Sequence, residues 1–438
     1  MRIPGFSAAG TAVVLLLVPG HAPISTGARD APASTAPGAD PQATVPGRDQ
    51  EITVAELGRL LFWDPILSGE RDVACATCHH PDFAYADGRA LSLGVGAVGI
   101  GPERRDTSNG RIPIVKRNSP TVLNVAFNGA GRRGRRDRDR DGGRDRDRDG
   151  ERDRLGDGAL PEVGGDRSPM FWDRRVRGLE AQALEPLKAL DEMRGMAYSE
   201  AVAVDSVVAR LRSIPEYARL FRAAFGAAPI DSAQLASAIA SFERSLSGMN
   251  SPFDRFRAGD ETALTEQQRR GRRAFDDAGC DRCHEGVMFS DFDLFAEGVP
   301  EHPLLAQPDT GDGRFRFRTP TLRNVALTAP YMHNGTLPTL EEVLRFYDEG
   351  RSRNPNVADA RSRRRDRDEE NDERRIPRVY RRFRAVDDMS ESEMQDIIAF
   401  LHALTDSDFD RIVPARVPSG LPPGGRIDAS GSAPGPSP

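Results

Sequence analysis

The chain has no hydrophobic run long enough to cross a bilayer as a helix. Its one marked apolar stretch, residues 8–18, follows Arg2 and precedes small residues at 20–22. A short apolar run with a basic start predicts a signal peptide over residues 1–22, although an uncleaved N-terminal anchor is the alternative. We therefore expect a secreted, periplasmic protein with no stable membrane insertion after signal removal.

An excess of one charge is also missing. The 438 residues include 61 basic and 67 acidic side chains, which gives a net charge of -6. This near balance provides no electrostatic basis for binding nucleic acid or an anionic membrane surface. Hydrophobic residues make up 38% of the chain, which allows a core, and the length allows two domains with tails.

Several segments lack the apolar residues that a core requires, because they are dense in charge or rich in Pro, Gly, Ser and Thr. We expect a flexible linker over residues 23–49, charged insertions over 129–165 and 361–375, and a disordered tail over 411–438. The remaining parts, residues 50–256 and 257–410, are predicted to form an N-terminal and a C-terminal domain.

Alternating strand patterns are scarce, whereas helical patterns recur. Apolar residues at helical spacing follow three capping-box pairs, Asp231 with Gln234, Thr339 with Glu342, and Ser390 with Glu393. The sequence therefore predicts an all-α fold with long loops.

Cysteine occurs only four times, and all four fall in two C-x-x-C-H motifs. One motif is Cys75, Cys78 and His79; the other is Cys280, Cys283 and His284. This pattern is typical of c-type heme attachment, in which two thiols add to the heme vinyl groups and the adjacent histidine ligates iron. We predict two covalently bound hemes c, with the two histidines as proximal iron ligands.

Three other interpretations of the motifs are weaker. A structural zinc site would place its second cysteine pair about 15–20 residues after the first, whereas these pairs are roughly two hundred residues apart. A redox-active cysteine pair would not need a histidine in the same place twice. Two structural disulfides are compatible with an oxidising compartment but leave both histidines unexplained.

Two hemes serve either an electron carrier or an enzyme. A carrier fills both axial positions on each iron, usually with His or Met, whereas an enzyme leaves one position open. Apart from His80, which directly follows His79, no histidine occurs in the stretch just after the first motif. We expect His80 at the surface or the heme edge and not as a ligand.

Longer segments resemble the bacterial diheme cytochrome c peroxidases. The resemblance covers roughly residues 50–410 apart from the insertions, and it is carried in order by residues 61–88, 117–128, 171–187, 251–260 and 318–335. It implies two cytochrome c-like heme domains, with the peroxidatic heme in the first and an electron-transfer heme in the second. It also implies hydrogen peroxide as substrate, a small cytochrome c or cupredoxin as electron donor, and calcium, whose ligands the sequence does not identify.

The resemblance gives catalytic roles to Trp172, Gln182 and Glu192. Trp172 would lie between the hemes and relay electrons. Glu192 would be the general acid/base that moves a proton between the peroxide oxygens, and Gln182 would orient the peroxide. The alternative is a surface glutamate and a glutamine on an exposed helix face.

Two positions depart from the classical members. Many of these have a histidine that caps the peroxidatic iron, and Val95 stands at its position here; this implies an iron that is open without reductive activation. Counted from His333, the methionine ligand of the second iron is replaced by Tyr347, as in the MauG-like branch, and a tyrosinate ligand stabilises oxidised iron. Met332 is the alternative ligand.

Three functions remain to be compared. The first is a diheme peroxidase that reduces hydrogen peroxide to water. The second is a MauG-like diheme oxidase that modifies a residue on a partner protein, although Ala278 stands where MauG has an interfacial tryptophan. The third is a diheme electron-transfer cytochrome, which predicts two six-coordinate irons and no spectral response to peroxide.

Overall fold

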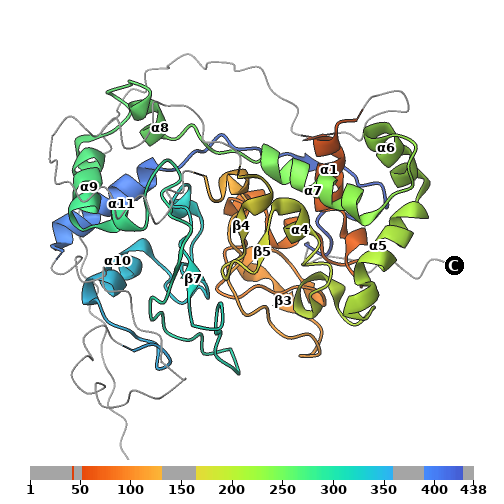
Figure 1. The fold of residues 1–438 in the computed structure, drawn as a ribbon, viewed down its shortest axis with the longest axis horizontal. Helices are drawn as coiled ribbons and strands as arrows, with labels where there is room; N and C mark the ends of the chain where they lie inside the picture. The colour runs from red at the N-terminus through yellow and green to blue at the C-terminus, as the bar shows by residue number, and fades with distance from the viewer. Residues whose placement is uncertain (1–41, 44–51, 131–163, 359–388, 428–438) are drawn as a thin grey trace, which may run out of the picture. The chain divides into compact units, whose positions relative to one another are not determined.

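The computed structural model describes residues 42–43, 52–130, 164–358 and 389–427, and within them helices predominate (Figure 1). The expected signal peptide, the insertion over 361–375, most of the insertion over 129–165 and most of the linker lie outside these residues. Among the residues that are described, no helix is long and apolar enough to span a bilayer. The predicted predominance of helix is confirmed.

Ten helices are described in these ranges. In the first half they are α1 Val54–Trp63, α2 Cys75–Cys78, α4 Leu179–Ala183, α5 Ala203–Arg212, α6 Pro215–Phe225 and α7 Ser232–Ser245. In the second half they are α8 Pro252–Arg257, α9 Glu266–Asp277, α10 Leu340–Glu349 and α11 Glu391–Ala403. The three capping boxes predicted from the sequence open α7, α10 and α11, which confirms those helix starts.

The described strands are only two residues long and form pairs. Antiparallel pairs join β2 Ala97–Val98 to β3 Arg105–Asp106, β4 Pro169–Met170 to β5 Val176–Arg177, and β6 Leu294–Phe295 to β7 Phe317–Arg318. The parallel pair joins β1 Gln42–Ala43 to β8 Val413–Pro414, with Gln42 opposite Val413. These pairs fasten loops and do not build a layer of the core.

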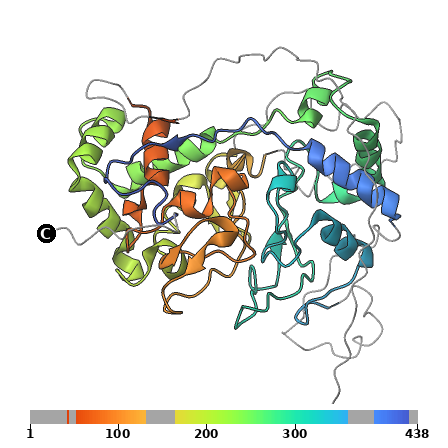
Figure 2. The ribbon, with the colours of Figure 1, turned by 180° about the vertical axis from the view of Figure 1, so that it is seen from behind.

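The same helix crossing occurs once in each half. α1 packs against α7, and α9 packs against α11 (Figures 1 and 2). A glycine lies at each crossing: a Cβ added to Gly58 would lie 2.9 Å from the Cβ of Phe242, and one added to Gly271 would lie 2.9 Å from the Cβ of Phe400. Only glycine lets the helix backbones approach this closely.

A matching asparagine fastens the end of the last helix in each half. The Asn124 N–H donates to the Leu246 carbonyl at 2.8 Å, and the Asn324 N–H donates to the Leu404 carbonyl at 3.1 Å. Each asparagine has a positive φ, and its side-chain oxygen accepts a backbone N–H from two residues beyond that carbonyl, at 2.8 Å in both cases. The two halves therefore repeat one design, in which a loop closes over a pair of crossed helices.

Each crossing has an apolar core. The first contains buried side chains from α1, α5, α6 and α7, among them Leu57, Leu211, Tyr217 and Leu235. The second is aromatic, and Phe253, Phe275, Phe289 and Phe400 meet edge to face with ring centroids 5.3 to 6.4 Å apart. Such aromatic pairs add stability beyond the area that they bury.

The prediction of a loose tail from residue 411 is wrong for residues 411–427; residues 428–438 lie outside the described part. The Gly424 N–H donates to the Trp63 carbonyl at 2.7 Å, and the Arg426 N–H donates to the Asp72 carbonyl at 3.0 Å. The Gly424 carbonyl also accepts a 2.8 Å hydrogen bond from Thr77, inside the first heme-attachment motif. Backbone groups make these bonds, so a Pro/Gly-rich composition did not reveal them.

Candidate active site

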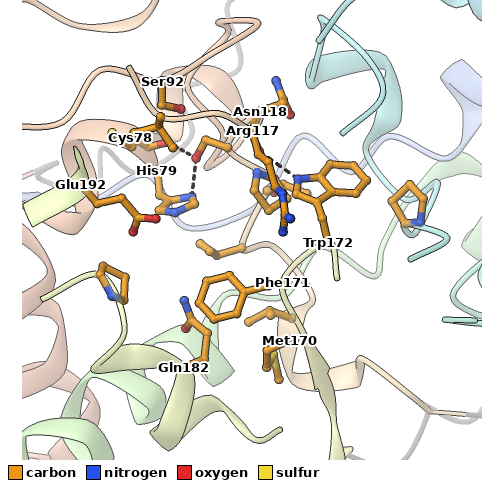
Figure 3. A pocket seen from close by; sticks show the side chains of 18 of the residues that line it. Cys78, His79, Ser92, Arg117, Asn118, Met170, Phe171, Trp172, Gln182 and Glu192 are labelled. Carbon is orange, nitrogen blue, oxygen red and sulfur yellow. Dashed lines mark hydrogen bonds between the residues drawn. The ribbon is translucent and has the colours of Figure 1, made fainter. Parts of the chain in front are cut away.

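The first C-x-x-C-H motif forms the short helix α2 and the residue that ends it. The His79 ring nitrogen Nδ1 lies 3.0 Å from the Tyr85 carbonyl oxygen and 3.3 Å from the Ser119 hydroxyl, and the hydroxyl also donates to the Cys78 carbonyl at 2.8 Å (Figure 3). Burial lowers the pKa of His79. A neutral imidazole whose Nδ1–H is bound to a carbonyl presents Nε2 to a metal, as proximal histidines do.

A cavity of about 490 Å³, here called the first cavity, opens beside this histidine. The structure brings every residue predicted for the peroxidatic site to its wall, namely Cys75, Cys78, His79, Trp172, Gln182 and Glu192. Figure 3 shows the Glu192 and Gln182 side chains pointing toward the space beside His79. Both side chains are half-buried and line the cavity, which speaks against the surface alternative.

Glu192 lies in a five-residue π-helical turn, Leu190–Arg194. Its carbonyl accepts a 2.9 Å hydrogen bond from the Val95 N–H, and the next carbonyl, of Met193, accepts one from Gly69 at 2.8 Å. The Gly94 backbone lies so close to the turn that a Cβ there would overlap it. Burial, helped by the nearby charge of Asp191, raises the pKa of Glu192 to about 7.

Trp172 lines both this cavity and a second one and is only 8% exposed. Its indole N–H donates to the Asn118 carbonyl at 2.9 Å (Figure 3), and its own carbonyl accepts from the Arg318 N–H at 2.6 Å. The Asn118 N–H in turn donates to the His333 carbonyl at 2.8 Å. Backbone groups from both halves of the chain therefore hold Trp172: Asn118 binds its indole N–H, and Arg318 binds its carbonyl.

The second C-x-x-C-H motif repeats the geometry of the first. The His284 Nδ1 lies 3.0 Å from the Phe289 carbonyl oxygen, and burial lowers the pKa of His284 to about 4. The adjoining second cavity measures about 190 Å³, and Cys280, Cys283 and His284 line it. This equivalence places a second neutral imidazole beside a second pair of thiols.

Both candidate ligands for the second iron line the second cavity. Tyr347 projects from α10, and burial raises its pKa well above the ordinary value, with the Glu297 carboxylate adding to the effect. Met332 lies in a loop with a φ of 72° and also reaches the first cavity. Tyr347 lines the second cavity and not the first, as a ligand specific to the second iron would.

Three ionisable groups at these cavities were not predicted from the sequence. Arg318 lines both, and burial lowers its pKa to about 10. Glu243 lines the first cavity and Glu297 the second; in each, the Oε2 atom is buried without a hydrogen-bond partner among the described residues, and burial raises the pKa to about 8. Helical spacing indicates that Glu243 is buried, because it lies four residues after Ile239 on an apolar face. No local pattern indicates the burial of the other two.

His80 is a further correction, because it is buried and not at the surface. Its ring meets Trp63 edge to face at 5.4 Å, and its Nδ1 accepts a 3.2 Å hydrogen bond from the Asp82 N–H. The His80 ring thus caps the turn Pro81–Phe83. The ring does not line the first cavity.

The residues present fit two hemes c. None of the four motif cysteines forms a disulfide, and burial raises the pKa of Cys78 and of Cys280 to about 12, so that these two thiols are neutral. Each pair shares an apolar-walled cavity with a neutral histidine, which is the donor set that covalent heme attachment requires. Within the described residues, no group of three or more His, Cys, Asp or Glu side chains is arranged to hold a bare metal ion.

Comparisons with known proteins agree with this chemistry. Residues 53–262 match the family model described as di-haem cytochrome c peroxidase, and residues 317–352 match one described as RoxA-like, cytochrome c-like. The chain is 32% identical to the methylamine utilization protein MauG of Methylorubrum extorquens over 80% of this chain and 77% of that protein. It is 33% identical to the cytochrome c551 peroxidase of Pseudomonas aeruginosa over 66% of this chain and 70% of that protein.

A solved structure shares the fold. The crystal structure of a MauG-like protein associated with microbial copper homeostasis aligns with a TM-score of 0.58 and 27% identity, over 84% of this chain and 93% of that one. Peroxidases and MauG proteins both occur among the relatives, and all belong to one family of oxidoreductases. With two heme-attachment motifs in place, this chain belongs to the MauG-like di-haem cytochrome c peroxidase family.

Proposed function

We propose that this protein is a diheme c-type peroxidase that reduces hydrogen peroxide to water with electrons from a small redox protein. The observation that carries the proposal is the position of Glu192: a half-buried carboxyl whose pKa is raised to about 7, on the wall of the same cavity as His79. A general acid/base works best when its pKa lies near the working pH. An electron carrier has no need of such a group.

Glu192 can take part in both proton transfers. With a pKa near neutrality, the carboxyl can accept a proton from peroxide and return it to the departing oxygen. Its backbone carbonyl accepts a hydrogen bond from Val95, and the carbonyl of the next residue, Met193, accepts one from Gly69, so the turn that carries the carboxyl is held in place. Gln182, on the same cavity wall, has an amide that can hold a peroxide oxygen but cannot change its charge.

Val95 supports access to the first iron. Many classical members that the chain resembles have a capping histidine at this position, whereas here the side chain is a buried valine with 2% exposure. Among the described residues that line the first cavity, His79 is the only histidine. Met193 also lines that cavity but belongs to the apolar core cluster of the first half, which argues against a role as iron ligand.

When bound, the hemes supply the redox chemistry, and the first supplies the iron position at which peroxide is reduced. The chain would hold the first through Cys75, Cys78 and His79 and the second through Cys280, Cys283 and His284. Trp172 lines both cavities, and we propose that it relays electrons from the second heme to the first. The protein part of the reaction is thus attachment, proton delivery and spacing of the two centres.

The remaining parts of the proposal rest on the sequence. We propose a periplasmic protein with an N-terminal signal peptide, two cytochrome c-like domains over residues 50–256 and 257–410, and a small cytochrome c or a cupredoxin as donor. A calcium ion is proposed from the family resemblance alone, and its ligands are not identified.

A MauG-like oxidase that modifies a residue on a partner protein is the second candidate. The observation that favours it is Tyr347, a half-buried phenol on the wall of the second cavity. A tyrosinate ligand favours oxidised iron and would make the second heme a poor acceptor from a cytochrome donor. Rapid steady-state oxidation of reduced cytochrome c by peroxide favours the peroxidase, and turnover no faster than without enzyme favours the oxidase.

Replacement of the catalytic carboxyl tests the proposal. Glu192→Gln should lower kcat/KM for peroxide by about 100- to 10,000-fold, the usual contribution of a general acid/base. Because the carboxylate form accepts the first proton, kcat/KM of the unmodified enzyme should rise as the pH passes upward through about 7. The variant should lose that rise.

Glu200→Gln is the matched control, because Glu200 is exposed and outside both cavities. It should retain the rate and the pH profile. If Glu192→Gln is as active as this control, Glu192 is not the acid/base and the proposal fails.

A further inference from the structure

A second buried carboxyl lies on the wall of the first cavity, and peroxide reduction as proposed above does not use it. Glu243 projects from α7, is 5% exposed, and shares the cavity with Cys75 and His79. Its Oε2 atom is buried and has no hydrogen-bond partner among the described residues. The carboxyl therefore borders the space that the first heme would fill, and one of its two oxygens has no partner in the described part of the chain.

Such a group is unstable as an anion. A buried, unpaired carboxylate costs several kcal/mol relative to water, so proton binding to the group is favoured. The next residue in the sequence is basic, but this residue, Arg244, forms its ion pair with Glu180 on α4 at 2.6 Å. Burial raises the pKa of Glu243 to about 8, against a smaller lowering by Arg244 and a small rise from Glu180.

The helices around α7 leave few other charges near Glu243. α7 packs against α1, α4, α5 and the turn Val125–Phe127, which has no titratable side chain. From α1, Arg59 lies over the Phe242 ring and pairs with Asp410. From α5 come Asp205, Arg210 and Arg212, and both arginines donate to backbone carbonyls, those of Ile66 and Ile230 among them.

The cavity side supplies the remaining neighbours. Cys75 is the neighbour that α2 supplies. Burial raises the pKa of its thiol, and the charge of Glu243 adds more to this rise than the charge of Glu192 does. Thioether formation removes the titration of Cys75. In the holoprotein, the charge of the first heme is then the variable charge that would change the proton affinity of Glu243.

We infer that Glu243 is a proton-binding site coupled to the first heme: it takes up one proton when that heme gains one electron and releases it when the electron leaves. The electron comes from a one-electron donor and enters the iron. The proton comes from water and forms an O–H bond on the Glu243 carboxylate, and no heme bond breaks. Reduction removes one positive charge near the carboxylate, and this raises its proton affinity in a low-dielectric site.

The inference requires a heme in the first cavity but not peroxide turnover. An enzyme with no peroxidase activity could show the coupling, and an active peroxidase could lack it. The two claims therefore fail separately.

Spectroelectrochemical titration of the holoprotein tests the coupling. The midpoint potential of the first heme is measured between about pH 5 and about pH 10, which brackets carboxyl groups with raised pKa values. In the unmodified protein the potential should fall with rising pH near 8, with a slope approaching one proton per electron. Glu243→Gln, which resembles the protonated form, should remove that dependence.

Two further variants assign the effect. Glu192→Gln and the exposed control Glu200→Gln should both keep the dependence near pH 8. An unchanged slope in Glu243→Gln, or a slope lost in Glu192→Gln, would overturn the inference.

Infrared difference spectra give a readout that does not require Glu243→Gln to fold. In the unmodified protein and in Glu192→Gln, reduction should add a protonated-carboxyl C=O band. The absence of that band from the Glu192→Gln spectrum would contradict the inference.

Discussion

The close crossing of α1 and α7 should make Gly58 irreplaceable, even by alanine. Gly58 lies inside a helix, where alanine is ordinarily the better residue by about 0.5–1 kcal/mol. A Cβ at this position would lie 2.7 Å from the Ala238 carbonyl carbon and 2.9 Å from the Phe242 Cβ, both inside the 3.0 Å that real Cβ atoms keep. These neighbours belong to a helix backbone and its first side-chain atom, so no flexible group can move aside.

Overpacking of this kind costs about 1–3 kcal/mol or more. Because the clash is with a helix backbone, the cost should lie near the upper end of this range, about 3 kcal/mol. After the gain in helix propensity, Gly58→Ala should still lower the free energy of unfolding by about 2 kcal/mol. Because α1 also packs against α2, the absorption spectrum of the first heme should change. Gly271→Ala should have the same cost at the α9–α11 crossing and disturb the second heme instead.

Urea denaturation followed by far-ultraviolet circular dichroism measures the effect. Ala223→Gly, at an exposed position of α6, is the control that reports helix propensity alone, with an expected loss of about 0.5–1 kcal/mol. If Gly58→Ala proved as stable as the unmodified protein, or more stable, the crossing would not be as close as described. The repeated design of the two halves would then lose its physical basis.

Three further substitutions test other parts of the account. Tyr347→Phe should change the low-spin paramagnetic resonance signal of the second heme, whereas an unchanged signal would leave Met332 as the ligand. Asp254→Asn should lower the free energy of unfolding by about 3–5 kcal/mol, because it removes the carboxylate that accepts two 2.8 Å hydrogen bonds from the fully buried Arg323 side chain; a loss below about 1 kcal/mol would contradict this. Trp172→Phe should slow electron transfer from the second heme to the first in stopped-flow measurements, and an unaltered rate would remove Trp172 from the route.

The sequence was most informative where structure is local. The heme-attachment motifs and the starts of α7, α10 and α11 each depend on residues only a few positions apart. Spacing within the chain also placed Tyr347 on the apolar face of α10, where it reaches the second cavity. Such features follow from helix periodicity and capping, which short segments encode.

The sequence was least informative where distant backbone groups meet. Residues 411–427 look loose by composition, yet Gly424 and Arg426 hydrogen-bond to the segment around the first motif. Arg318 is 239 residues from His79 in the sequence, but both line the first cavity. Burial of Glu243 could have been anticipated from its helical register, but its lack of a partner depends on Arg244 being paired with Glu180.

Low-temperature electron paramagnetic resonance of the purified holoprotein tests the central claim most directly. That claim is a first iron with a position open to peroxide beside the Glu192 carboxyl. The account predicts a high-spin ferric signal in the resting protein, which disappears when one equivalent of hydrogen peroxide is added. A resting protein whose two irons are both low-spin, with spectra that peroxide leaves unchanged, would contradict it and would indicate an electron carrier.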